Sequence, residues 1–391
     1  MKNLRVRKWI WLCIWILTLV GISFYGGAVS YGLFWAVSLL PLVSFVYLLC
    51  VYLRFRIYQE IESRQVVCDQ PMPYYFVLRN EDKFGFASVK VRMFPDYSYV
   101  EDVDKDVEYE LLPGDEYLYR TKLVCRYRGE YEVGVKEVII TDFFGIFSFK
   151  YRMPGTIRAI VRPKIVEICE VNSLSNLAVD MEREALLNKT EPDVVVRDYV
   201  NGDSLRKIHW KAVARLGKLL VRNDIGTEKQ GVAILFDTCR YSRKMAEHLP
   251  VESKLLESLL ALTMFFAGKN VPVTVFYGKN GLAREEVSGL RSFESFYARV
   301  SNMIFDEEEN PLRVMEQVYE RVLFRDARIL VCVFHSWNDK MMMLSEQIAA
   351  TGVCVVAYVV TDESCEEYRK HNTDRKKVVV IPVHAELEGV L

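Results

Sequence analysis

The segment from Glu191 to Arg215 holds the densest set of groups able to do chemistry in this 391-residue chain. Basic side chains alternate there with carboxylates, and these residues are Arg197, Arg206, Lys211 and Arg215 with Asp193, Asp198 and Asp203. The basic groups could bind an anion, but interleaved opposite charges usually satisfy one another. We therefore expect a salt-bridge network that holds this segment against the domain that follows it.

His209 lies in the same segment and could in principle act as a general base. No serine or cysteine beside it sits in a recognisable nucleophile motif, so packing or hydrogen bonding is the favoured role. Asp203 or Ser204 can cap a helix here, and Gly217 suits the end of that helix. The segment is therefore expected to contain a short helix.

A second candidate site lies at Asp237, directly after the apolar run 231–236. Ligands of open α/β sheets bind beyond the carboxyl ends of the strands, so a carboxylate there could help to hold a hard cation. Asp339 follows another predicted strand and could add a second carboxylate or cap the next helix. With the hydroxyl of Ser242, these two aspartates are the metal candidates.

The residues next to Asp237 argue against magnesium. Cys239 offers a thiol, which is a poor magnesium ligand, and Arg240 adds positive charge beside the carboxylate. We expect no tight metal site and predict no cofactor. Asp237 is then expected to accept hydrogen bonds from its own turn, or to pair with Arg240 or another cation.

The chain contains none of the common catalytic motifs, namely GxSxG, a P-loop, HExxH or CxxC. Its five histidines are too dispersed in sequence to indicate a zinc site. Catalytic groups can still meet in space, so a hydrolase with an unrecognised site stays as an alternative. The favoured prediction is a non-enzymatic protein.

The elements that must position these groups begin with a membrane hairpin, residues 1–56. No charged residue occurs from Trp9 to Leu53, a stretch too long for one span but suited to two. We predict spans at 9–25 and 30–53, with Gly26 and Gly27 in the turn. Basic residues flank both outer ends, which places both termini in the cytoplasm. A cleaved signal peptide is the alternative.

Residues 57–165 alternate between apolar and polar side chains, which predicts a β-sandwich. Its expected strands are 74–79, 89–93, 106–112, 117–127, 131–140 and 157–163. The charged segment, residues 166–229, follows. Residues 230–391 alternate strands and helices, which predicts a doubly wound, mostly parallel α/β domain. Its expected strands are 231–236, 271–277, 328–334, 353–360 and 377–383, with helices at 255–266, 311–324 and 339–350.

The charge of the chain argues against one function class, and its cysteine content indicates the compartment of its soluble part. The net charge of −1 hides a basic membrane segment and a net-acidic remainder, which argues against non-specific nucleic-acid binding. The nine cysteines show no paired spacing, so they are interpreted as buried apolar groups or free thiols of a cytoplasmic domain.

The charged segment resembles the hallmark of the bacterial "domain of unknown function 58" family. The matching positions are Arg197, Tyr199, Gly202, Asp203, Arg206, Ile208, Trp210, Ala214 and Arg215. The sequences Arg128-Gly129-Glu130-Tyr131 and Asp142-Phe143-Phe144-Gly145-Ile146-Phe147 resemble further family patterns, with Phe143 in place of the usual proline. The order of the domains is also similar over nearly the whole chain.

This resemblance implies a von Willebrand factor A-like fold for the α/β domain. Such domains bind a cation through D-x-S-x-S, and here Cys239 and Tyr241 stand at the two serine positions. The resemblance also implies association with MoxR-type AAA+ ATPases. We therefore expect a membrane-anchored interaction or scaffold protein, with a metal-dependent adhesion module as a further alternative.

Overall fold

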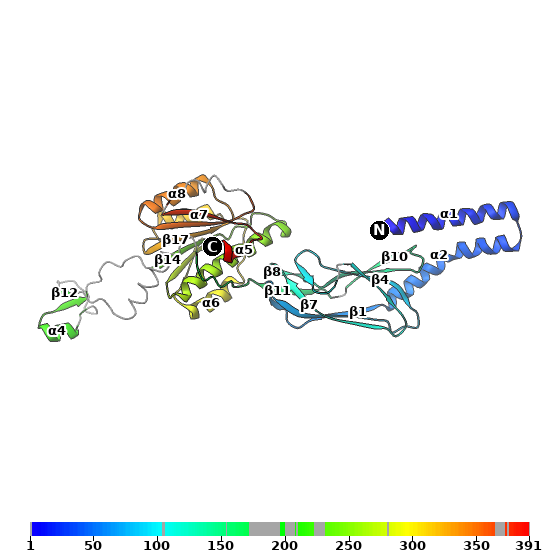
Figure 1. The fold of residues 1–391 in the computed structure, drawn as a ribbon, viewed down its shortest axis with the longest axis horizontal. Helices are drawn as coiled ribbons and strands as arrows, with labels where there is room; N and C mark the ends of the chain where they lie inside the picture. The colour runs from blue at the N-terminus through cyan, green and yellow to red at the C-terminus, as the bar shows by residue number, and fades with distance from the viewer. Residues whose placement is uncertain are drawn as a thin grey trace. The chain divides into compact units, whose positions relative to one another are not determined.

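The computed structural model describes residues 2–103, 106–153, 155–171, 196–199, 208, 210–222, 231–279, 281–363, 372–373 and 375–390. The chain divides into two compact units, Met1–Arg162 and Pro163–Leu391, which are described separately (Figure 1).

The first unit begins with two antiparallel helices, α1 (Lys2–Tyr25) and α2 (Ala28–Arg54). Gly26 and Gly27 join them with φ angles of 50° and 110°, a region that glycine enters without steric cost. Both helices are long and apolar enough to cross a membrane, over Val6–Tyr25 and Ala28–Arg54. This confirms the predicted pair of apolar helices and the position of the turn.

The end of α2 packs into the core of the β module. Leu48, Val51 and Phe55 are buried in the same apolar cluster as the strands. Near the same end, the hydroxyl of Ser44 donates a hydrogen bond to the buried carboxylate of Asp142. The last turns of this apolar helix therefore contact protein.

The β module consists of two antiparallel four-stranded sheets, with orders β1-β3-β7-β5 and β10-β9-β4-β6, and a small sheet of order β2-β11-β8. Side chains from the two larger sheets share one apolar core, which fits the predicted β-sandwich. The strands are β1 Arg56–Ile61, β2 Gln65–Val67, β3 Pro71–Arg79, β4 Phe86–Met93, β5 Ser98–Val100, β6 Asp106–Leu111, β7 Glu116–Cys125, β8 Gly129–Val133, β9 Val135–Thr141, β10 Ser148–Arg152 and β11 Ile157–Arg162.

The run 131–140, predicted as one strand, is divided between two sheets. Gly134 separates β8 from β9 and has a φ of 81°, which interrupts an extended strand. A side chain at this position would also approach within 2.7 Å of Gln59 Oε1 and 2.9 Å of the Tyr74 hydroxyl. A single glycine therefore redirects the chain from one sheet to the other.

The second unit contains a six-stranded sheet of order β16-β15-β14-β17-β18-β19, parallel except for β16 at one edge. Its elements are β14 Gly231–Phe236, α5 Met245–Gly268, β15 Val273–Gly278, β16 Leu282–Val287, α6 Leu290–Val300, α7 Pro311–Glu320, β17 Ala327–Phe334, α8 Asp339–Ala350, β18 Cys354–Val360, β19 Lys376–Ile381 and a short 3₁₀ helix at Leu387–Gly389.

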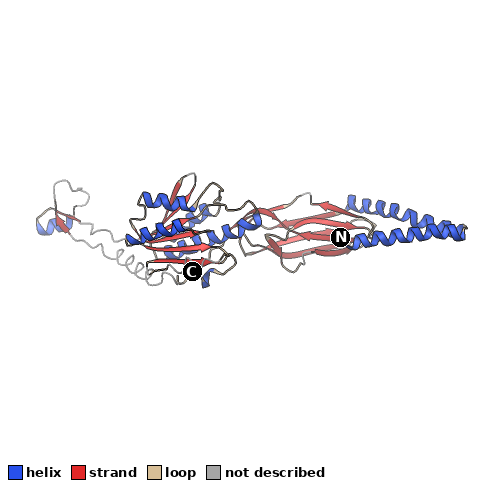
Figure 2. Ribbon diagram, turned by 90° about the horizontal axis from the view of Figure 1, so that it is seen from above, coloured by secondary structure: helices blue, strands red, loops and turns tan. Residues whose placement is uncertain are grey.

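Helices cover both faces of this sheet (Figure 2). Along β14, Val232 and Ile234 pack into the core that contains α5 and α6, while Leu235 packs into the core that contains α7 and α8. Such alternation between two buried faces explains why the whole strand is apolar. The doubly wound arrangement agrees with the prediction, which had not included β16, α6 and the 3₁₀ helix.

Candidate functional site

The candidate site lies where the chain reverses its direction of travel across the six-stranded sheet. From the central strand β14, the chain moves outward to β15 on one side and later returns to β17 on the other. Ligands of doubly wound sheets bind at this switch point, beyond the carboxyl ends of the strands. Asp237 directly follows β14 and His335 directly follows β17, so both residues lie at the switch point.

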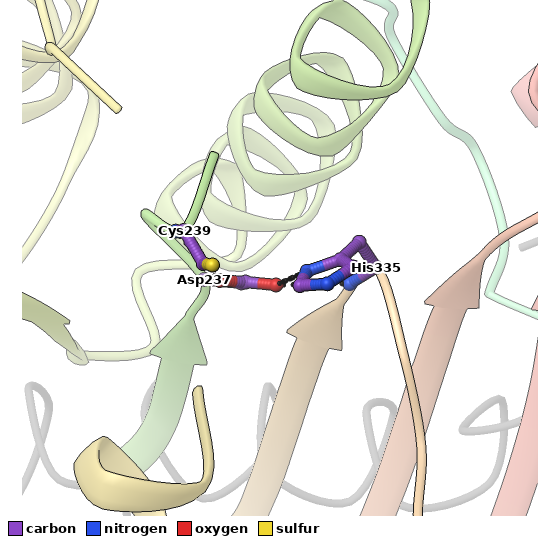
Figure 3. Close-up of side chains that lie close together, drawn as sticks. All are labelled: Asp237, Cys239 and His335. Atoms are coloured by element: carbon purple, nitrogen blue, oxygen red, sulfur yellow. Dashed lines mark hydrogen bonds and ion pairs between the residues drawn. The ribbon is translucent and has the colours of Figure 1, made fainter. Parts of the chain in front are cut away.

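Asp237 has no solvent exposure, and its carboxylate is held by several donors. One oxygen, Oδ1, accepts a hydrogen bond of 2.8 Å from the backbone N–H of Cys239. The other, Oδ2, accepts a 3.0 Å bond from the backbone N–H of His335 and also contacts the ring Nδ1 of that residue (Figure 3). The carboxylate therefore joins the turn after β14 to the turn after β17.

The sulfur of Cys239, the carboxylate of Asp237 and the ring of His335 lie together, with their ligand atoms within 4.8 Å of one another (Figure 3). Burial, followed by the nearby negative charges led by Asp237, raises the pKa of the half-buried Cys239 thiol to about 11. At neutral pH this cysteine therefore keeps its proton and is a weak nucleophile. The other acidic groups that contribute are Glu309, Asp306 and Glu252.

Backbone contacts hold the turn that carries this group. The hydroxyl of Thr238 donates a 2.9 Å hydrogen bond to the carbonyl of Gly278 at the end of β15. The backbone N–H of Asp306 bonds to the carbonyl of Thr238 at 3.0 Å, and that of Arg240 bonds to the carbonyl of Asp306 at 2.9 Å. The position of Cys239 is therefore set by two other loops at the same sheet edge.

The sequence had allowed a pair between Arg240 and Asp237, but the structure pairs Arg240 with another carboxylate. Its Nε donates a 2.9 Å hydrogen bond to the buried carboxylate of Glu252 on α5. The ring of Tyr241 stacks on that of His335 with centroids 5.6 Å apart, and its hydroxyl donates to the carbonyl of Glu247. The side-chain partner of Asp237 is therefore His335.

Two opposing effects act on His335. Burial of the ring lowers its pKa, but the hydrogen bond and the negative charge of Asp237 together outweigh burial. The pKa of His335 is therefore raised above its ordinary value of 6.5. A protonated ring strengthens the contact with Asp237 because both partners then carry charge.

We expect the stability of the α/β domain to decrease as pH rises through the raised folded-state pKa of His335. The unfolded state has the lower pKa, so the contribution of this pair is complete below that value and is lost above the folded one. The measurement is the difference in melting temperature between the parent chain and His335→Gln from pH 6 to pH 9. This difference should be largest at pH 6 and should shrink in an Asp237→Asn background. A difference that stays constant with pH would contradict the charged pair.

Asp237, Cys239 and His335 could together hold a metal ion, because one oxygen, one sulfur and one nitrogen lie within 4.8 Å of one another. Such a mixed donor set suits zinc better than magnesium. The other two metal candidates lie elsewhere. Ser242 donates a 2.6 Å hydrogen bond to Glu247, and Asp339 is the exposed first residue of α8, where Asn338 provides the cap.

Titration of the full chain with magnesium should show no saturable micromolar binding. Magnesium requires about six oxygen ligands in near-octahedral geometry, and here a thiol and an imidazole stand beside the carboxylate. Calorimetry measures the binding, and zinc in the same titration is the comparison. Micromolar magnesium binding that Asp237→Ala abolishes would show that the carboxylate alone sustains a metal site.

The charged motif is described in part. Arg197 lies in β12 (Val196–Asp198), which pairs antiparallel with β13 (Leu220–Arg222), and the backbone N–H of Tyr199 bonds to Leu219 at 2.9 Å. Ile208 is buried, whereas Trp210 at the start of α4 (Trp210–Leu216) is 67% exposed. Ala214 and Arg215 are exposed on α4. Gly202, Asp203 and Arg206 lie outside the described residues, as do Asp193 and His209, so the proposed salt-bridge network stays a prediction.

Sequence reasoning had not selected His335 as a site residue. The signal was nonetheless present, because His335 follows a buried apolar strand in the same way as Asp237. What was missing was the strand order, which alone shows that these two strand ends are neighbours.

No family model matches the chain, and no curated protein matches it. Solved structures show weak likeness. Proximal thread matrix protein 1 from the mussel byssus is 11% identical, with a TM-score of 0.30, and covers 38% of this chain, which spans only 43% of that protein. The CARDB domain of a Pyrococcus furiosus protein, in complex with di-metal ions, is 18% identical with a TM-score of 0.19, over 27% of this chain and 93% of that one. A GH20 exo-β-N-acetylglucosaminidase from Vibrio harveyi is 9% identical with a TM-score of 0.19, and the match covers 84% of this chain and 78% of that one.

Proposed function

We propose that this chain is a membrane-anchored, non-enzymatic interaction protein. The observation that carries this proposal is the Cys239 thiol at the switch point, which keeps its proton although the carboxylate of Asp237 and the ring of His335 lie beside it. A catalytic cysteine has a lowered pKa, because the thiolate and not the thiol is the nucleophile. Here burial and the surrounding negative charges raise the pKa of the Cys239 thiol, so it keeps its proton at neutral pH. The arrangement stabilises the sheet edge and is poorly suited to acyl transfer.

The α/β domain is proposed to be von Willebrand factor A-like and the chain to belong to the "domain of unknown function 58" family. The doubly wound sheet with one antiparallel edge strand supports the first assignment, and the residues of the charged motif support the second. The partner class that follows is a MoxR-type AAA+ ATPase. The exposed face of α4, with Trp210 at 67% exposure, is a suitable contact surface for such a partner.

The partner proposal is tested by photo-crosslinking of the full chain in its native membrane. A crosslinking residue in place of Trp210 should capture an AAA+ ATPase. Met343 on α8 is the matched control position, because it is also a large apolar side chain and is 62% exposed. Equal capture of the same protein from both positions would contradict a specific surface. Hydrolytic turnover that His335→Ala abolishes would instead establish the enzyme alternative.

The proposed topology has two membrane spans with both termini in the cytoplasm. Basic residues at both outer ends and the uncharged turn at Gly26 support it. A reporter fused after Leu391 should be active in the cytoplasm, and one inserted at Gly26 should lie outside. Protease cleavage of the α/β domain from outside intact cells would contradict this orientation. Release of a shortened chain without α1 would support a signal peptide.

A metal-dependent adhesion module is the second candidate function. The observation that favours it is the approach of three donor atoms of Asp237, Cys239 and His335 to within 4.8 Å of one another. Zinc binding in the titration described above, combined with partner capture that a chelator abolishes, would favour this alternative over metal-independent recognition.

A further inference from the structure

A basic cavity of about 580 Å³ lies in the first unit, between the start of α1 and the sheet β10-β9-β4-β6. Its cationic lining residues are Arg7, Lys8, Lys90, Arg92 and Lys150, and its acidic ones are Glu108 and Asp142. The lining therefore has an excess of positive charge, within a chain that is otherwise slightly acidic. A cavity of this size and charge suits an anionic group.

The strand register places hydroxyls and lysines in adjacent rows across the cavity wall. Ser88 on β4 and Ser148 on β10 both lie opposite Thr141 on β9. In the next outward-facing row, Lys90 and Lys150 both lie opposite Ile139. Hydroxyl and ammonium groups are donors to phosphate oxygens. Because the hydroxyl of Ser88 already donates to Glu108, the donors suited to a phosphate group are those of Thr141, Ser148 and the two lysines.

The two acidic groups in the lining are engaged with protein donors. Asp142 accepts hydrogen bonds from the backbone N–H groups of Phe147 at 2.7 Å and Phe144 at 3.2 Å, as well as from Ser44. Glu108 accepts a 2.5 Å bond from the hydroxyl of Ser88. Glu137 on β9 also pairs with the lining residue Arg92 at 2.8 Å, and the five cationic lining residues still outnumber these three carboxylates.

The cavity adjoins the helices that are proposed to cross the membrane. Arg7 and Lys8 stand at the start of the apolar helix α1, and the turn after β9 packs on α2 through the rings of Phe143 and Tyr47, which are 4.6 Å apart. A second cavity, of about 360 Å³ and with an almost wholly apolar lining, also touches Tyr47, and its wall includes Leu42 and Val46 of α2. The Tyr47–Phe143 pair therefore stands between a basic cavity and an apolar one.

We propose that the basic cavity binds the phosphate of an anionic membrane phospholipid, with an acyl chain along the apolar cavity. The adjacent apolar cavity favours a lipid over a soluble phosphate, because a phospholipid joins an anionic group to apolar chains. Lysines and arginines at the cytoplasmic membrane surface attract anionic lipids. The proposal rests on the membrane anchorage proposed above and is independent of any protein partner.

The test is native mass spectrometry of the purified full chain in detergent, titrated with phosphatidylglycerol and, separately, with phosphatidylcholine. The parent should retain phosphatidylglycerol in preference. Lys90→Ala with Lys150→Ala should weaken that binding roughly fivefold for each lysine, because one lysine near a phosphate surface contributes about 1 kcal/mol. Lys90→Arg with Lys150→Arg should retain binding, which separates loss of charge from loss of fold.

Lys122→Ala is the matched control. Lys122 and Lys150 are both 61% exposed and each lies in a long ion pair, of 3.9 Å with Glu101 and 3.8 Å with Glu137 respectively. Lys122 lies on β7 in the other sheet and should not affect lipid binding. Equal binding by the double alanine variant and the parent, or equal loss in Lys122→Ala, would overturn the proposal.

Inorganic phosphate separates the two sources of the anion. If phosphate alone binds as tightly as phosphatidylglycerol and displaces it, the cavity is a soluble-phosphate site and the lipid assignment is wrong. The membrane anchorage is tested separately, by carbonate extraction of native membranes. If the chain is not anchored, carbonate extracts it, whatever the purified protein binds. The crosslinking experiment at Trp210 does not depend on either outcome.

Discussion

Replacement of Asp237 by alanine should destabilise the α/β domain by about 3–5 kcal/mol. The carboxylate has no solvent exposure and accepts hydrogen bonds from the backbone N–H groups of Cys239 and His335, in addition to its contact with the His335 ring. Alanine would leave two backbone donors without their acceptor and a histidine without its charged partner. Each unsatisfied buried donor costs about 1–3 kcal/mol.

The loss can be measured locally through Cys332, a fully buried thiol in β17. Its rate of labelling by a thiol reagent reports opening of the domain. Asp237→Asn should give an intermediate loss, because an amide oxygen can still accept the bond from Cys239 but carries no charge. Asp339 is exposed and lies between β17 and α8, at the start of that helix. Asp339→Ala should therefore change stability by less than about 0.5 kcal/mol. Equal effects of Asp237→Ala and Asp339→Ala would contradict the structural role of Asp237.

Replacement of Asp142 by alanine should destabilise the β module by about 2–4 kcal/mol. This buried carboxylate accepts bonds from the backbone N–H groups of Phe144 and Phe147, which close the turn between β9 and β10. It also accepts a hydrogen bond from the hydroxyl of Ser44, which joins that turn to α2. Its removal should loosen the turn and the contact of the module with the helix together.

Cys125 is the local reporter for this unit, because its thiol is fully buried in the β-module core. Asp115→Ala is the matched control, since Asp115 also accepts a backbone N–H within a turn of the same module, at 2.7 Å from Leu112, but is only half-buried. Its loss should cost about 0.5–1 kcal/mol. Equal labelling rates of Cys125 in the two variants would show that burial and the contact with Ser44 do not matter.

The helical hairpin could be predicted from the sequence because its cause is local. A charge-free stretch of suitable length and a pair of glycines define two helices and a turn without reference to the rest of the chain. The contacts of the end of α2 could not be predicted in this way. An apolar residue such as Leu48 suits lipid and protein interior equally well, and only the folded β module shows that it is buried by strands.

The β module illustrates a second limit. Alternation of apolar and polar residues predicts strands correctly, but it does not show which sheet a strand joins. The run 131–140 was predicted as one strand, yet Gly134 sends its two halves to different sheets. The reason is a left-handed backbone conformation and close contact with Gln59 and Tyr74, which appear only when distant strands pack together.

The sequence by itself determined that Asp237 and His335 each end a buried apolar strand, because a continuous apolar run followed by a polar residue is a local pattern. It could not determine that the two residues, 98 positions apart, form one pair. That outcome depends on the strand order, in which β17 lies beside β14 while β15 lies on the other side. Only this tertiary arrangement places the imidazole against the carboxylate, with the thiol of Cys239 nearby. The physical reason is that the packing of helices on both faces of the sheet decides which strand ends become neighbours.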